Sequence, residues 1–330
     1  MTPREQTELF EETILCPQAC LAKDARRLRA EEPCPYRTAF QRDRDRILHS
    51  SAFRRLKRKT QVFLSPIGDH YRTRMTHTLE VSQIARTMAR ALRLNEDLTE
   101  AIALGHDLGH SPFGHAGEAA LNEICPHGYR HYEQSVRVVH YIEKNGRGLN
   151  LTQQVKNGIV CHTNRIASTL EGNLVRLADR IAYINHDIDD AIRGGILREQ
   201  DLPQDCTELL GHSKSERITT MISSVIEHGI ESMDMMPEIR KAHDELHAFL
   251  YANVYSNSLA KSEDSKAQML VKRLYAHFRE HLNELPREYM DLAERFSPDR
   301  AVCDYIAGMS DDFAIRLYEK LYVPRSWDVR

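Results

Sequence analysis

Residues 101–118 read AIALGHDLGHSPFGHAGE. The first half of this stretch is apolar and belongs to a helix predicted over about 96–106, which Asn95 is placed to cap. Gly109 and Pro112 then interrupt the helical pattern. The chain therefore places a histidine and an aspartate side by side where a helix ends. The apolar positions of this helix are Leu98, Ala101, Ile102 and Gly105.

Two further helices supply polar groups on faces that are expected to be buried or to line a pocket. The first is predicted over 72–92, where His77 shares the apolar face that continues through Val81, Ile84, Met88 and Ala91. The second, over 170–192, carries an apolar stripe opposite a polar one, both with the helical period. The apolar stripe holds Leu177, Ile181, Ile184, Ile188 and Ile192, and the polar stripe holds Asp179, Tyr183, His186, Asp187 and Asp190.

The predicted fold class is all-α, because glycine and proline are sparse, at 15 and 12 residues, and no apolar alternation is sustained. Residues 199–215 are interpreted as a linker and residues 256–265 as a loop. We expect an N-terminal extension over 1–35, a core over 36–200 and a helical C-terminal region over 201–330 that packs on the core. Later helices are marked by Ile218, Ile222 and Val225, by Ile239, Leu246 and Leu250, and by Leu270, Leu274, Phe278 and Leu282.

The composition is that of an ordinary globular protein, with 41% of the 330 residues hydrophobic and 28% charged. The net charge of −3 excludes a molecule whose whole surface attracts nucleic acid. No apolar run has the length of a membrane span, and the N-terminal MTPREQTELFEETI lacks the apolar core of a signal peptide. Seven scattered cysteines favour reduced thiols over a disulfide framework. A cytoplasmic location is expected.

Four residues are predicted to hold one divalent metal: His77, His106, Asp107 and Asp179. A divalent ion prefers imidazole and carboxylate ligands that converge from rigid elements. An adjacent histidine and aspartate at a helix end can both reach one ion, and the two neighbouring helices supply the other two ligands. An open coordination position would then serve to activate a water molecule.

Each of these residues also has an ordinary interpretation when it is taken alone. A histidine on an apolar face, such as His77, is usually a satisfied core residue. An aspartate such as Asp179 commonly pairs with a neighbouring arginine, here Arg176 or Arg180, in a surface ion pair of little value. The order of the four residues is a weak pattern by itself, because the gaps between them are free.

Five longer stretches carry a family resemblance. The chain from about 37 to 322 resembles the deoxynucleoside triphosphate triphosphohydrolases of the HD superfamily, the dGTPase-like family. The resemblance implies an HD-domain helical core with a helical C-terminal extension. It also implies hydrolysis of a dNTP at its α-phosphorus, with release of a deoxynucleoside and inorganic triphosphate. The stretches are SAFRRLKRKTQVF, YRTRMTHTLEVSQIAR, AIALGHDLGHSPFGHAGE, TLEGNLVRLADRIAYINHDIDDAI and AVCDYIAGMSDDFAIRLYE.

The resemblance implies catalytic roles for His115, Glu118, His110 and His131. The leaving group is a 5′-alkoxide, so a general acid is required. His115 and Glu118 are three residues apart on one face of a new helix, where the carboxylate is expected to orient the imidazole. His131 departs from the family pattern in the residue that follows it, Tyr132, and a surface histidine is the alternative for it.

The resemblance further implies substrate contacts. Arg74 and Arg180 match phosphate-binding cations, with exposed salt-bridge arginines as the alternative. Tyr183 and Asp187 follow Asp179 at one and two turns and are expected to line the sugar pocket, or else to form a solvated face. Gln61 resembles a residue that contacts the sugar or base, with a loop amide as the alternative.

The expected cofactor is Mn²⁺, Mg²⁺, Fe²⁺, Co²⁺ or Ni²⁺, with a second ion arriving with the substrate as an additional expectation. Residues 42–60 hold eight Lys or Arg against two Asp, so they are candidates to bind an allosteric dNTP or single-stranded nucleic acid. Relatives imply a homo-oligomer. The alternative functions are an HD phosphohydrolase acting on nucleoside monophosphates or another phosphoester, and a nucleotide- or DNA-binding regulator with a vestigial site.

Overall fold

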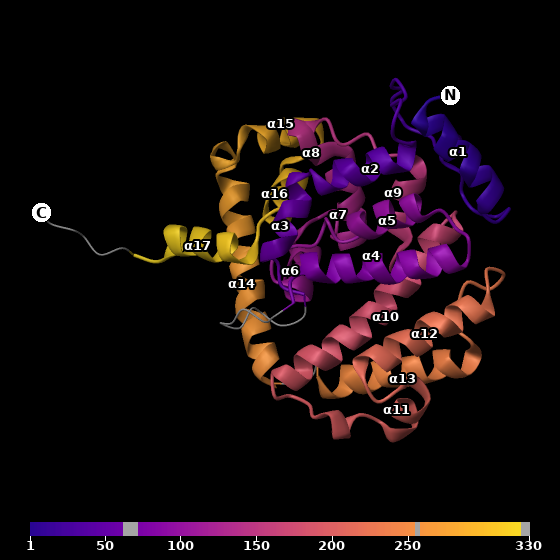
Figure 1. Cartoon of the computed structure of the whole chain (residues 1–330). Helices are drawn as coiled ribbons and strands as arrows, with labels where there is room; N and C mark the ends of the chain where they lie inside the picture. The colour runs from indigo at the N-terminus through magenta and orange to yellow at the C-terminus, as the bar shows by residue number, and fades with distance from the viewer. Residues whose placement is uncertain (62–71, 255–257, 325–330) are drawn as a thin grey trace, which may run out of the picture.

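The structure is a computed structural model that describes residues 1–61, 72–254 and 258–324 (Figure 1). Within these ranges the chain forms α-helices joined by turns, and no β-strand, so the predicted all-α class is confirmed. The helices are α1 (Pro3–Ile14), α2 (Ala39–Leu48), α3 (Ser51–Arg55), α4 (Arg74–Ala91), α5 (Glu96–Gly105), α6 (Gly114–Ile124), α7 (His131–Arg137), α8 (Glu143–Gly146), α9 (Gln153–Cys161), α10 (Leu170–Arg193), α11 (Gln204–Leu210), α12 (Lys214–His228), α13 (Pro237–Asn253), α14 (Ser258–Glu280), α15 (Arg287–Arg295), α16 (Pro298–Ala307) and α17 (Asp311–Tyr322).

Helix α10 runs through the middle of the molecule and is covered on both sides. It packs against α4, α5 and α9 on one side and against α12 and α13 on the other (Figure 1). Its apolar stripe is buried, as expected, at positions such as Ile181 and Ile188. Three members of its polar stripe, His186, Asp187 and Asp190, are buried as well. A solvated polar face is therefore the wrong interpretation for Asp187.

Helices α4 and α5 begin at side-chain caps and pack against each other. Thr73 caps α4, and the Asn95 side chain accepts a hydrogen bond of 3.1 Å from the Leu98 amide, as predicted for α5. On α4 the predicted stripe is buried at Val81, Ile84 and Met88, and Ala91 is exposed because the helix ends there. Each large apolar side chain buried in this way contributes about 1.5–3 kcal/mol.

The C-terminal region forms two layers of helices. Helices α11, α12 and α13 pack together beside α10, and α14 packs against α6 and α16 (Figure 1). The predicted linker over 199–215 is wrong, because it contains α11. The predicted loop over 256–265 is also wrong from Ser258 onward, where α14 begins, and its first two residues lie outside the described residues.

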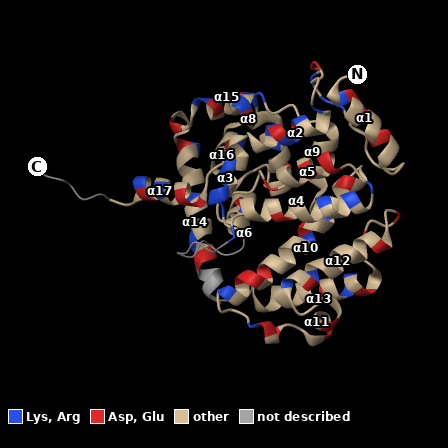
Figure 2. Ribbon diagram, in the orientation of Figure 1, with Lys and Arg blue, Asp and Glu red and all other residues tan. Residues whose placement is uncertain are grey.

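The N-terminal extension lies against the core. Arg27 pairs with the buried Asp43 of α2, and the Arg26 carbonyl accepts a hydrogen bond of 2.7 Å from the Gln153 amide. Lysines and arginines are interspersed with acidic residues over the helices seen in Figure 2. Among the described helices, none combines the length and the apolar character that a membrane crossing requires.

Candidate metal centre and adjoining pocket

The end of α5 fixes the imidazole of His106. The His106 Nδ1 atom lies 2.6 Å from the carbonyl oxygen of Ala103, one turn back in the same helix. A carbonyl only accepts, so Nδ1 carries the hydrogen and Nε2 keeps its lone pair. That Nε2 atom is buried without a hydrogen-bond partner. A buried lone pair with no donor is the expected condition of a metal ligand.

The four predicted metal ligands converge on this atom from three helices. His77 of α4 places Nε2 at 3.1 Å from Asp179 Oδ1 of α10 and at 3.9 Å from Asp107 Oδ2. His106 Nε2 lies 3.3 Å from Asp107 Oδ1 and 3.8 Å from Asp179 Oδ1. Ligand atoms of His77, His106 and Asp107 lie within 4.8 Å of one another, close enough to surround one ion.

The donor set suits a divalent cation. It combines two imidazole nitrogens with two carboxylates, a combination that binds Mn²⁺, Fe²⁺, Co²⁺, Ni²⁺ or Mg²⁺. Burial alone would raise the pKa of Asp107, but His106, His110 and Arg74 outweigh it and hold that pKa well below its ordinary value. The carboxylate is therefore ionised and ready to bind a cation.

Arg74 lies directly beside the predicted metal ligands. Its guanidinium donates a hydrogen bond of 2.8 Å to Asp107 Oδ2, and both side chains are buried. A second nitrogen of Arg74 contacts the Gln61 carbonyl at 3.4 Å. The exposed salt-bridge arginine is therefore the wrong interpretation for Arg74, and Gln61 is buried rather than a solvated loop amide.

A second group of histidines adjoins the predicted metal ligands. His110 Nε2 lies 3.1 Å from Asp107 Oδ1, and the His110 ring stacks on His131 with centroids 4.0 Å apart. The Glu118 carboxylate accepts two hydrogen bonds from His131, one from Nδ1 at 2.9 Å and one from the backbone amide at 3.1 Å. Burial alone would raise the pKa of Glu118. The hydrogen bonds from His131 outweigh this effect, and the net result is a lowered pKa.

The expected pairing of Glu118 with His115 is corrected by these contacts. Both residues lie on α6, but Glu118 is buried toward α7, whereas His115 is exposed. Spacing along one helix predicted that His115 and Glu118 lie near each other, and each does shift the pKa of the other, but it missed the hydrogen-bonding partner of Glu118 from another helix. The surface interpretation of His131 is wrong, since its ring lies within the cluster.

His162 belongs to the same cluster and was not predicted. It directly follows α9, and its Nδ1 atom lies 2.7 Å from the Ile159 carbonyl, which repeats the arrangement of His106. Its Nε2 atom lies 3.3 Å from His131 Nε2. Burial lowers the pKa of His162 to about 4, so the imidazole is neutral. A histidine directly after an apolar helix was the available sequence signal.

A cavity of about 340 Å³ opens beside Asp179 and His162. Helix α10 contributes the predicted residues Arg180 and Tyr183 to the cavity wall, whereas the predicted residue Asp187 is fully buried and is not among the lining residues. Burial raises the pKa of Asp187 well above its ordinary value, and the nearby Asp190 adds to the shift. The opposite wall is α13, which supplies Arg240, His243, Asp244 and His247. None of these four had been predicted as a site residue.

The first part of the cationic segment over 42–60 is neutralised by ion pairs. Arg44 pairs with Asp45, Asp97 and Glu100, and Arg46 pairs with Glu31. Lys59 is buried and donates hydrogen bonds to backbone carbonyls of His110 and Ala307. Arg54, Lys57 and Arg58 are exposed, and binding of single-stranded nucleic acid or of an allosteric dNTP by this segment stays a prediction.

Comparisons with known proteins agree with this geometry. The family model of the HD domain matches residues 74–184, and that of the phosphohydrolase-associated domain matches residues 233–320. A solved phosphohydrolase from Bacteroides thetaiotaomicron has the same fold, with a TM-score of 0.54, 17% identity, and coverage of 84% of this chain and 68% of that chain. The fold and site define an HD-domain phosphohydrolase with a buried His/Asp cluster that fits a divalent metal.

More similar relatives define the family. A protein from Caldanaerobacter subterraneus subsp. tengcongensis is 55% identical over 99% of this chain and 98% of its own length. Proteins from Desulfatibacillum aliphaticivorans and Clostridium perfringens are each 48% identical over 98% of this chain and 99% of their own length. All three are named deoxyguanosinetriphosphate triphosphohydrolase-like proteins, and the chain belongs to this family.

Proposed function

We propose that the protein hydrolyses deoxynucleoside triphosphates to a deoxynucleoside and inorganic triphosphate. The observation that carries this proposal is the convergence of two imidazoles and two carboxylates beside a cavity walled by arginines. A nucleoside triphosphate offers the matching chemistry, with several negative charges at one end and a flat apolar surface at the other. The names of the relatives point to the same substrate class.

His77, His106, Asp107 and Asp179 would hold the divalent metal. An ion bound by this set would lower the pKa of a water molecule and neutralise phosphate charge. Arg180 on the cavity wall is proposed to bind the triphosphate, and Arg74 to keep the Asp107 carboxylate in place. Tyr183, on the same wall, is proposed to pack against the sugar, above the buried Asp187.

The departing 5′ oxygen requires a proton, and we assign the role of proton donor to His131. Its Nδ1 hydrogen is donated to Glu118, and its Nε2 atom faces the histidine cluster. A carboxylate bonded to Nδ1 orients the ring and stabilises its protonated form. His110, stacked on His131, and His115, at the exposed start of α6, are proposed to contact the phosphates.

A substrate panel tests this proposal. The purified protein is incubated with Mn²⁺ and each of the four dNTPs and GTP, and the products are separated by ion-exchange chromatography. The proposal predicts inorganic triphosphate and deoxynucleoside in equal amounts. Orthophosphate or pyrophosphate as the only inorganic product would contradict it, and cleavage restricted to nucleoside monophosphates would favour the alternative phosphohydrolase.

Two finer expectations are tested alongside the panel. Mixtures of dNTPs reveal whether one nucleotide activates hydrolysis of another, as an allosteric dNTP would. Light scattering of the purified protein gives the assembly state, for which a homo-oligomer is predicted.

A further inference from the structure

We infer that His186 and Glu80 are positioning residues for His77, and that they form a hydrogen-bonded chain which turns the Nε2 lone pair of His77 toward the metal. This inference rests on the metal site of the proposed function. It assigns a task to two residues that contact neither the cavity wall nor the proposed ion. It also explains why the buried polar stripe of α10 extends beyond Asp179.

The two edges of the His77 ring face different partners. Its Nε2 atom faces the carboxylates, at 3.1 Å from Asp179 Oδ1. Its Nδ1 atom lies 3.2 Å from the Nδ1 atom of His186. The Nε2 atom of His186 lies 2.7 Å from Glu80 Oε2. Four residues on two helices, α4 and α10, thus form one continuous row of polar contacts.

The hydrogens of this row can be assigned from the chemistry of its ends. A metal ligand needs a lone pair on His77 Nε2, so the hydrogen of a neutral His77 sits on Nδ1. That hydrogen is donated to His186 Nδ1, so His186 carries its own hydrogen on Nε2. This second hydrogen is then available to the Glu80 carboxylate, whose Oε2 atom lies 2.7 Å from Nε2. Each atom of the row then has the role that its neighbour requires.

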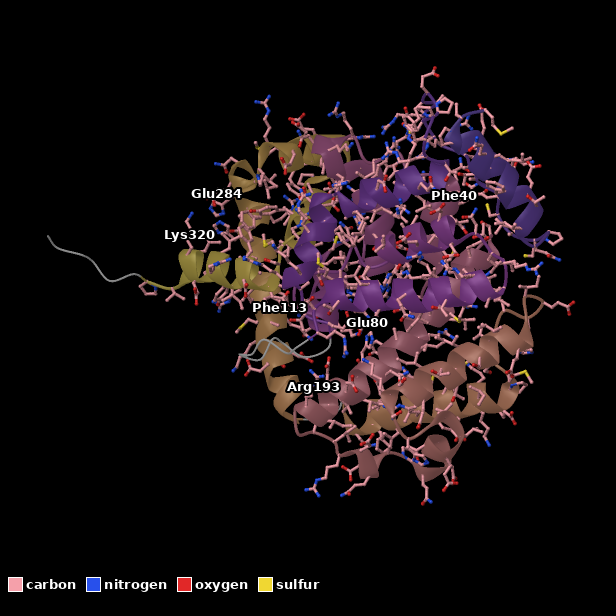
Figure 3. The ribbon with its side chains drawn as sticks, viewed as in Figure 1. Phe40, Glu80, Phe113, Arg193, Glu284 and Lys320 are labelled. Carbon is pink, nitrogen blue, oxygen red and sulfur yellow. The ribbon has the colours of Figure 1, made fainter. Side chains whose placement is uncertain are left out.

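The outer end of the row is fixed by cations. Arg72 places Nε at 2.9 Å from Glu80 Oε2, and Lys214 at the start of α12 lies 3.8 Å from Oε1. Figure 3 labels Glu80 on α4, where that helix faces α10. His77 and His186 are each 1% exposed, so bulk water does not replace the hydrogen bonds between them. Partners that orient a ligating histidine typically contribute 10–100-fold in metal affinity.

Metal affinity of matched variants tests the inference, with Mn²⁺ alone as the probe in calorimetric titrations. His186→Leu removes the acceptor at nearly constant volume, and we expect about 10–100-fold weaker Mn²⁺ binding. His186→Asn returns an acceptor oxygen near the position of Nδ1 and is expected to recover part of this loss. Glu80→Gln keeps the shape of a partly exposed side chain, and therefore the fold, while its charge is removed, and it too should weaken binding.

A stability control separates positioning from packing. Asp43 of α2 is not one of the proposed metal ligands, and it forms a buried ion pair with Arg27 of the N-terminal extension. Asp43→Asn breaks this pair and should lower Tm without changing the Mn²⁺ affinity. Equal Mn²⁺ affinity in His186→Leu, Glu80→Gln and wild type would overturn the inference and leave the metal site standing. A wild-type protein that binds no Mn²⁺ would instead overturn the proposed function itself.

Discussion

Three histidines of the site are each held in place by a hydrogen bond from Nδ1 to an acceptor oxygen. His106 donates to the Ala103 carbonyl and His162 to the Ile159 carbonyl, at 2.6 and 2.7 Å. His131 is held in the same way by the Glu118 carboxylate at 2.9 Å. In every case the opposite nitrogen, Nε2, is left for the site. The Nε2 atoms of these residues therefore hold fixed positions before any ligand binds.

Replacement of Asp107 by asparagine tests the metal assignment at a single atom. An amide is a much poorer ligand than a carboxylate and leaves Arg74 without its counter-charge. We expect Asp107→Asn to purify without bound metal and to lose roughly 1,000-fold or more in turnover. Metal content by mass spectrometry and initial rates measure the two effects. Turnover close to that of wild type would refute the assigned site.

A pair of histidine variants tests the general acid. His131→Asn should lower kcat by about 10²–10⁴-fold with little change in KM, because the proton donor is lost but the substrate still binds. His115→Asn, the matched change at the exposed start of α6, should affect KM more than kcat. The reverse pattern, with the larger kcat loss in His115→Asn, would assign the acid to His115.

The sequence predicted which residues gather at the candidate metal centre better than how they pair. The four predicted ligands were proposed from helical faces and from the end of α5, and the family resemblance made this weak pattern specific. The partner of Glu118 did not, because His131 reaches it from α7 through the tertiary fold. His162 was missed for the same reason, because its position directly after α9 does not reveal the histidine cluster that it faces.

At the scale of elements, the turn between α5 and α6 depends on close packing against α7. The Gly109 amide donates a hydrogen bond of 2.9 Å to the Ser135 hydroxyl. A Cβ atom at Gly109 would lie 2.1 Å from the Ser135 backbone nitrogen and 2.5 Å from the His131 carbonyl oxygen. Backbone atoms of a helix cannot move aside easily, so this position requires glycine. Phe113, directly before α6, also belongs to this turn (Figure 3). It has a φ of 63°, and its amide donates a hydrogen bond of 3.0 Å to the Asp311 carboxylate.

Gly109→Ala should therefore displace α7 together with His131. We expect a loss of about 1–3 kcal/mol of stability and a fall in kcat, since the turn carries Asp107 and His110. Gly194→Ala is the control, because its φ of −74° suits any residue and its nearest new contact is 3.2 Å away. Thermal melts and steady-state rates report both effects. A Gly109→Ala protein as stable and active as the control would disprove the packing argument.

One element that the sequence missed lacks a strong apolar stripe. Helix α11 lies in a polar stretch, and only Cys206 and Leu210 of its residues are buried. The polar stripe of α10 could not be assigned to solvent or core, because local pattern does not reveal that α12 and α13 cover this helix. Long helices with regular apolar spacing, such as α4, α5 and α13, were predicted correctly.

At the scale of the whole molecule, the site loops are braced by distant parts of the chain. Asp311 of α17 accepts hydrogen bonds from the amides of Thr60 and Phe113, and Asp304 of α16 accepts one from Gln134 of α7. Lys59 joins the carbonyls of His110 and Ala307. The C-terminal region thus holds the loops around the candidate metal centre in place, and its helix α13 also forms one wall of the cavity. The predicted boundaries at 35 and 200 stay predictions.

The buried Lys59 makes stability depend on pH. Burial lowers the pKa of Lys59 from its ordinary value of 10.5 to about 7. The unfolded chain therefore binds more protons than the folded chain between these two values, and stability rises with pH across that window. Lys59→Met removes this contribution. We expect the Tm difference, wild type minus Lys59→Met, to increase from pH 7 to pH 9.5 in thermal melts. A difference that is constant or falls over this range would contradict the assignment.

The account depends most on one bound ion. Crystals grown with Mn²⁺ and measured at an energy where manganese scatters anomalously would locate it directly. We predict an anomalous peak at bonding distance, about 2.0–2.3 Å, from side-chain atoms of His77, His106, Asp107 and Asp179. An active preparation whose crystals show no peak among these four side chains, or show it only elsewhere, would contradict the account.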